Sequence, residues 1–390
     1  MPFLARSQSK PLNLDQAIAI AFANRPSVQS ARLDVDRAKA TRRSMAAAPA
    51  TELRVGISSD TRVGSSDDDL AVAQPIDIFG RTAAARASGD ALLRQSEAAL
   101  RRAEVDLQSD VIRAYLEAAA SAERVSIAKQ LETTAGELLG AVRQLVDGGR
   151  LAGIQATRAS IEFTRSQATT RQREADVAAN ARRLSGAVGV ELSPAETVFP
   201  SIPVEVIDDR ALQTQRADLM ALAAEISLAD ADKKVARASR RPLLELQGRR
   251  SPWQQADQQY GVRIQLSFPL FDSGKSHAEE SAGDLRSRAA SKALADALRL
   301  ARTELDADLI EVDAAAEQLK ALKSVLSTSR ELYQRTQTGL KEGANTLVDT
   351  LDALRAVREI EESIVDAKLA LGRAQAKYVA VTGRLPEVRP

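Results

Sequence analysis

The sequence contains no cysteine, a single histidine (His277), and only 3% aromatic residues among its 390 positions. Without cysteine there is no disulfide framework, no thiolate metal site and no cysteine nucleophile. A catalytic triad would have to use His277, which lies in the polar segment 273–277 and is more simply interpreted as a solvated side chain near a helix start. No phosphate-binding loop or cluster of metal ligands is recognisable. The sequence therefore predicts a protein that is not an enzyme and uses no metal or cofactor.

Charge of one sign and long apolar runs are also lacking. Lys and Arg number 54 against 53 Asp and Glu, a net charge of +1, so there is no basic field to bind nucleic acid. No segment reaches the roughly 20 apolar residues of a membrane-spanning helix. Residues 1–6 show no secretory signal. Such a start is typical either of a protein retained inside the cell or of a mature or re-engineered start.

What the sequence does contain is a duplication with an offset of about 194 residues. Gly89-Asp90 recurs as Gly283-Asp284, and Gly148-Gly149-Arg150 recurs as Glu342-Gly343-Ala344. Internal repeats of this kind determine the architecture. We therefore divide the chain into a first repeat at 13–190, a proline-bearing linker at 191–207, a second repeat at 208–384 and a C-terminal tail at 385–390.

Each repeat is predicted to run helix, strand, strand, long helix, turn, helix. The opening helices are expected at 15–48 and 209–240, each followed closely by a proline. Because proline is absent from the segments that follow, long helices are predicted at about 80–148 and 275–342. At 1.5 Å per residue each would be roughly 100 Å long, which indicates a coiled coil or a tube. A soluble coiled-coil scaffold protein remains the alternative.

The predicted strands, at about 50–58, 69–76, 243–249 and 259–268, alternate apolar with polar residues. An ordinary half-buried hairpin would show the same alternation. Four strands cannot close a barrel, but three chains would supply about 12, with a polar lumen and an apolar face toward lipid. The residues expected to face lipid are Leu53, Val55, Ile57, Val262, Ile264, Leu266 and Phe268.

Four segments carry a resemblance to a known family. They are 12–18 with 24–26, the strand-to-helix junctions 74–81 and 268–275, and the second helical turn 343–353. In their order and duplication these segments resemble the TolC-like outer-membrane efflux proteins, over about residues 12–384.

The resemblance implies a mainly α fold with a small β part: a homotrimeric α-helical tunnel in the periplasm, topped by an outer-membrane β-barrel of four strands per chain. The linker and the tail would form an equatorial belt. The function implied is a passive exit duct of a tripartite efflux or type I secretion system, docked to a periplasmic adaptor protein and an inner-membrane pump. Drugs, metal ions and secreted proteins all remain possible cargo.

The resemblance also assigns roles at the two helical turns. Adaptor docking is expected at Gly149, Arg150, Leu151, Gly343, Ala344 and Asn345. Asp349 and Asp352 correspond to aspartates that would form two acidic rings at the tunnel entrance, although Thr346 and Asp349 also fit a helix-capping box. The family's best-known gate has no counterpart here, because Leu340, Asn345 and Gln155 replace its gating residues.

Overall fold

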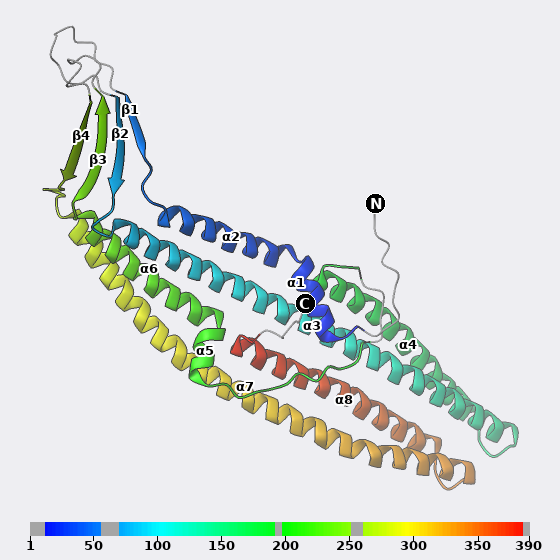
Figure 1. The fold of residues 1–390 in the computed structure, drawn as a ribbon. Coiled ribbons are helices and arrows are strands. Elements are labelled where there is room, and N and C mark those ends of the chain that lie inside the picture. The colour runs from blue at the N-terminus through cyan, green and yellow to red at the C-terminus, as the bar shows by residue number, and fades with distance from the viewer. Residues whose placement is uncertain (1–11, 56–69, 192–196, 251–259, 385–390) are drawn as a thin grey trace, which may run out of the picture. The chain divides into compact units, whose positions relative to one another are not determined.

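The fold is taken from a computed structural model, which describes residues 12–55, 70–191, 197–250 and 260–384. Within these ranges it contains helices and one antiparallel sheet (Figure 1). The predicted class, mainly α with a small β part, is confirmed. Ile57, residues 192–196 of the linker and the C-terminal tail at 385–390 lie outside the described residues.

The chain forms two compact units. A helical unit combines Met1–Gln29, Ala103–Gln215 and Leu300–Pro390, and a sheet unit combines Ser30–Arg102 and Arg216–Arg299. Two long helices, α3 (Arg81–Asp147) and α7 (Lys275–Glu342), contribute residues to both units. At 67 and 68 residues, each is about 100 Å long.

The sheet unit contains four antiparallel strands in the order β1-β2-β3-β4. They are β1 (Glu52–Val55), β2 (Leu70–Ile76), β3 (Leu243–Arg250) and β4 (Tyr260–Ser267). The central pair, β2 and β3, joins the two halves of the chain, and Val72 lies opposite Gly248. The sheet is therefore built equally from both repeats.

Helix pairs continue from this sheet, and each pair meets at a glycine. On α3, a Cβ added to Gly89 would lie 2.9 Å from the Cα of Arg42 on α2 (Pro26–Ala46). On α7, a Cβ added to Gly283 would lie 2.7 Å from Cγ of Lys233 on α6 (Ala217–Ser239). The repeated glycine is thus explained by a close helix approach, in which an added side chain would have to displace its neighbour.

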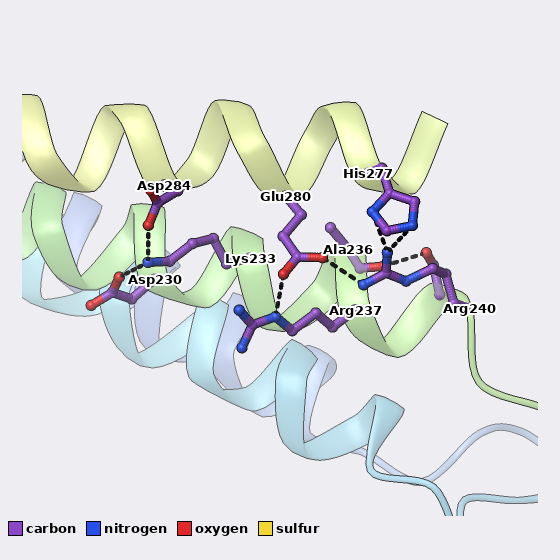
Figure 2. Close-up of polar contacts among 9 residues, drawn as sticks. Asp230, Lys233, Ala236, Arg237, Arg240, His277, Glu280 and Asp284 are labelled. Atoms are coloured by element: carbon purple, nitrogen blue, oxygen red, sulfur yellow. Dashed lines mark hydrogen bonds and ion pairs between the residues drawn. The ribbon is translucent and has the colours of Figure 1, made fainter. Parts of the chain in front are cut away.

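The aspartate after each glycine pairs with the cation across the same contact. Arg42 pairs with Asp90, and Lys233 Nζ lies 3.4 Å from Asp284 and 2.8 Å from Asp230 (Figure 2). Further along α6 and α7, Arg240 Nη1 lies 3.0 Å from His277 Nδ1, and Glu280 accepts a hydrogen bond from Arg237 (Figure 2). The single histidine therefore belongs to a charged seam between two helices.

In the helical unit, residues 103–147 of α3 and 300–342 of α7 pack with four more helices. These are α1 (Leu14–Asn24), α4 (Gly153–Val188), α5 (Asp209–Gln215) and α8 (Leu347–Thr382). Leu116 of α3 is 1% exposed and lies against Gly372 of α8, where an added Cβ would be 2.7 Å from its Cδ2. The α3–α8 contact is thus another close, small-residue approach.

The opening helix of each repeat is not continuous, which corrects the sequence prediction. The helix breaks at Arg25 (φ −76°, ψ 124°) and again at Arg216 (φ −78°, ψ 120°), giving the short helices α1 and α5. At Arg25 the cause is Pro26, which disfavours helical backbone in the residue before it. Ala217 follows Arg216, so proline explains the break in one repeat only. Among the described helices, none combines the length and apolar character needed to cross a membrane.

Candidate functional site

The first candidate surface is the turn between α3 and α4. Helix α3 ends at Asp147, and Gly149 takes a left-handed backbone with φ +72°. The N–H groups of Arg150 and Leu151 both donate to the Leu145 carbonyl, at 2.8 and 3.2 Å. A left-handed glycine with such a backward hydrogen bond is the common way to end a helix and reverse the chain. We call residues 148–152 the first tip.

The turn between α7 and α8 repeats this geometry 194 positions later. Gly343 has φ +82°. The N–H groups of Ala344 and Asn345 donate to the Gly339 carbonyl, at 2.7 and 3.1 Å. Both turns therefore combine a left-handed glycine with backward hydrogen bonds from the two residues that follow it. We call residues 343–346 the second tip.

One apolar cluster supports both tips. It combines Leu138 and Val142 of α3 with Ala159 of α4, Leu340 of α7, and Leu347 and Leu351 of α8. Leu340, which was expected at a gating position, is 3% exposed and is a core residue of this cluster. Because all four helices contribute, neither tip can move far without disturbing the other's packing.

The two tips differ in how the outgoing helix begins. Thr346 and Asp349 form the predicted capping box: Asp349 N–H donates to Thr346 Oγ1 at 3.2 Å, and Thr346 N–H donates to Asp349 Oδ2 at 2.9 Å. Hydrogen bonds from the Thr346 side chain and backbone lower the pKa of Asp349 below its usual 3.8. At the first tip, Ala152 makes no side-chain cap. The counterpart of Asp349 is Gln155, whose Oε1 is buried without a partner among the described residues.

Asp352 has an ionic partner that sequence reasoning missed. Its Oδ1 accepts a hydrogen bond from Arg355 Nη1 at 3.1 Å, while Arg355 Nη2 donates to Glu162 Oε2 at 3.2 Å. Arg358 also approaches Glu162, at 3.6 Å. The spacing of Asp352 and Arg355 could have revealed the first pair. Glu162 is 193 positions away on α4, so no local pattern indicates the second.

The other predicted tip residues lie around these turns. Arg150 and Ala344 are exposed, and Leu151 and Asn345 are half-buried. The Asn345 side chain covers Gly339, where an added Cβ would collide with it. Two apolar side chains beside the tips went unnoticed in the sequence: Ile154 is 58% exposed, and Val348, 194 positions later, is 44% exposed.

The exposed surfaces of the outgoing helices carry opposite charge. On α8, Asp349, Asp352, Glu359 and Asp366 are exposed. The corresponding residues of α4 are Gln155, Arg158, Arg165 and Gln172. The repeats thus share a backbone but present different electrostatic surfaces. Within the described part of the chain, no group of His, Asp or Glu side chains is placed to hold a metal ion.

The second candidate surface is the apolar face of the sheet. The strand register places Leu53 opposite Val72, and Gly248 opposite Val262, so these residues share one face. Leu53, Val262 and Ile264 are 65%, 78% and 73% exposed. Val55 and Leu266 lie on the same face and are also exposed. Phe268 was predicted to end the fourth strand, but β4 ends one residue earlier, at Ser267. Its side chain is 58% exposed.

The opposite face of the sheet is polar and internally bonded. Arg54 pairs with Glu245 at 2.7 Å, and Gln247 Nε2 donates to Gln265 Oε1 at 3.2 Å. The sheet therefore has one face suited to lipid and one suited to water.

Comparison with known proteins matches this combination of sheet and duplicated helices to one family. The model of the outer membrane efflux protein family matches residues 17–190 and 209–384. The chain belongs to this family. Its expected membership and outer-membrane location are thereby confirmed.

Individual relatives are distant in sequence but close in fold. Outer membrane protein OprJ of Pseudomonas aeruginosa is 24% identical over 392 residues, covering 90% of this chain and 80% of OprJ. The crystal structure of CusC superposes with a TM-score of 0.76 at 18% identity, covering 97% of this chain and 95% of CusC. The open-state structure of the Neisseria gonorrhoeae MtrE outer membrane channel gives a TM-score of 0.74 at 19% identity, covering 95% and 89%.

Proposed function

We propose that this protein is the exit duct of a tripartite efflux or secretion system. Three copies would form a β-barrel in the outer membrane above a helical tunnel, whose tips dock to a periplasmic adaptor tied to an inner-membrane pump. The observation that carries this proposal is the exposed, two-faced sheet with unpaired strands at both edges, in a member of the outer membrane efflux protein family. The duct itself is passive, and the pump supplies the energy.

The barrel follows from what an open sheet of this kind requires. Among the described strands, β1 and β4 each pair on one side only. Exposed edges beside an apolar face would favour aggregation. Joining β4 of one copy to β1 of the next removes both edges, and three copies bring together about 12 strands, enough for a closed barrel.

The duplication supports the same head-to-tail arrangement for the helices. On α7, Ile310, Val325 and Leu332 are 70%, 47% and 52% exposed. Their counterparts 194 positions earlier are Leu116, Leu131 and Leu138, which are buried or partly buried within the chain. If α7 of one copy meets the next copy as α3 meets α8, this apolar stripe becomes covered.

The surface that would receive this stripe is also present. Within the chain, Leu116 lies against Gly372 of α8. The corresponding contact between copies would place Ile310 against Ala178 of α4. Ala178 is exposed and lines a groove of about 680 Å³ with other small side chains, including Ala181, Ser185 and Gly186.

At the tips, Asp349 and Asp352 would repeat around the threefold axis and attract cations at the entrance. The exposed apolar residues Ile154 and Val348 extend the predicted docking surface at Gly149, Arg150, Leu151, Gly343, Ala344 and Asn345. Asp349 would then serve both as helix cap and as entrance carboxylate.

The test is assembly followed by conductance. The purified protein should require detergent, run as a trimer and form channels in planar bilayers. The double variant D349N/D352N, which removes six charges per trimer, should lose cation selectivity and block by a trivalent cation such as hexamminecobalt(III). A stable monomer in plain buffer would contradict the duct and favour a soluble scaffold. Unchanged selectivity would show that both aspartates have only local roles.

A further inference from the structure

Arg355 lies where a charged entrance meets a buried carboxylate. Its guanidinium connects Asp352, which is 63% exposed, with Glu162, which is only 8% exposed. Each of the two Nη atoms serves a different carboxylate, at 3.1 and 3.2 Å. Such a two-sided contact uses the planar guanidinium in a way that a lysine ammonium cannot reproduce.

Glu162 fixes the position of this guanidinium. A buried carboxylate needs ionic and hydrogen-bond partners, and Arg355 and Arg358 provide them at 3.2 and 3.6 Å. These side chains line a small cavity of about 20 Å³ between α3, α4 and α8, which has room for about one water molecule. The buried Glu162 carboxylate therefore holds the Arg355 guanidinium in place, whereas an arginine on the surface without such a partner would move freely.

The net charge beside the second tip depends on this anchor. Asp349 and Asp352 contribute −2 per chain, and Arg355 adds +1, leaving −1 for the three groups. Glu162 and Arg358 cancel each other. Among the described residues Asp349 has hydrogen bonds to Thr346 and no ionic partner.

The repeat shows that this arrangement is particular to the second tip. The residue 194 positions before Arg355 is Ile161, which is 51% exposed, and the position after Glu162 by the same offset is Ala356. The duplicated scaffold therefore does not require either charged group, and packing alone does not account for Arg355.

We infer that Arg355 is a specificity-determining residue of the entrance, because Glu162 holds its guanidinium against Asp352 and leaves Asp349 as the principal uncompensated carboxylate. This rests on the proposed function, in which the second tips surround the entrance. The consequence is an entrance with three net negative charges per trimer from these groups, where the two aspartates alone would give six.

The experiment is a charge cycle measured by reversal potential in a KCl gradient and by hexamminecobalt(III) block of single trimeric channels. R355Q should increase cation selectivity and tighten the block roughly tenfold. The reason is that the variant removes three positive charges per trimer and leaves three exposed Asp352 carboxylates free to attract the trivalent ion. D352N should weaken both. D352N/R355Q restores the net charge and should return both readings close to wild type. R355K keeps the charge but cannot bridge Glu162 and Asp352 at the same time, so both readings should lie between those of wild type and R355Q.

The matched control is R335Q, because Arg335 is an exposed arginine of α7 that pairs with Glu331 on its own helix. If R355Q matches R335Q in selectivity and block, or changes only thermal stability, the inference is wrong. If D349N/D352N also has no effect, the entrance itself has been misplaced and the proposed function fails at that point. If D352N/R355Q does not return selectivity and block close to wild type, Arg355 affects the channel through the packing of the helices and not through its charge.

Discussion

Thr346 and Ala152 occupy the same place in the two repeats, but only Thr346 caps its helix. Thr346→Ala should cost about 1 kcal/mol locally, the usual effect of losing a threonine cap. Hydrogen exchange at the amides of residues 346–349 should then become faster. Thr338→Ala is the control, because Thr338 donates only to the Gln334 carbonyl within α7. Equal exchange in both variants would contradict a capping role.

The same cap should depend on pH. Thr346 lowers the pKa of Asp349 in the fold below its usual 3.8, so the carboxylate stabilises the cap fully above that usual value. The stabilisation is lost as the pH falls through the lowered pKa. Protection factors for residues 346–349, corrected for intrinsic exchange, should therefore be equal at pH 7 and pH 5 and lower near pH 3. A loss already complete at pH 5 would indicate a different titrating group.

At the scale of helices, the contact glycines differ in what surrounds them. A Cβ on Gly89 would lie 2.9 Å from a backbone atom, the Cα of Arg42, whereas a Cβ on Gly283 would first meet the flexible side chain of Lys233. We expect Gly89→Ala to destabilise by about 1–3 kcal/mol, as overpacking does, and Gly283→Ala to cost less. Gly140→Ala should stabilise slightly, because Gly140 has nothing within 4 Å and alanine favours helix.

Heat resistance of the assembled protein, followed by circular dichroism, should rank these variants. The expected order is Gly140→Ala most stable, then Gly283→Ala, then Gly89→Ala. A Gly89→Ala protein as stable as wild type would show that α2 and α3 can separate at no cost.

Sequence patterns predicted the elements well where the cause is local. Alternation located the strands, and the glycines at 149 and 343 located both tips. The breaks at Arg25 and Arg216 were missed because the apolar spacing continues through them, and only the first is followed by proline. The Glu162–Arg355 pair was missed for another reason: it joins residues 193 positions apart, and its existence depends on how α4 packs against α8.

For the whole molecule, the absence of cysteine makes the proposed contact between copies directly testable. Ile310→Cys on α7 combined with Ala178→Cys on α4 should form disulfides between neighbouring copies on mild oxidation, because the thiols would lie within bonding range. Denaturing, non-reducing gels should show covalent dimers and trimers. On the same gels each single variant should run as a monomer, since a head-to-tail contact brings two different residues together. Only monomers from the double variant would contradict the arrangement.

The near-equal helix lengths have a consequence for how such a chain can evolve. Helices α3 and α7 have 67 and 68 residues, and α4 and α8 have 36 each. Both tips share one apolar cluster. One inserted residue in α3 alone would advance its tip by about 1.5 Å and rotate it by about 100°, removing Leu138 and Val142 from their partners. Insertions and deletions in these helices should therefore survive only as matched changes in both repeats, so that a duplicated gene carries a length constraint that neither half would have alone.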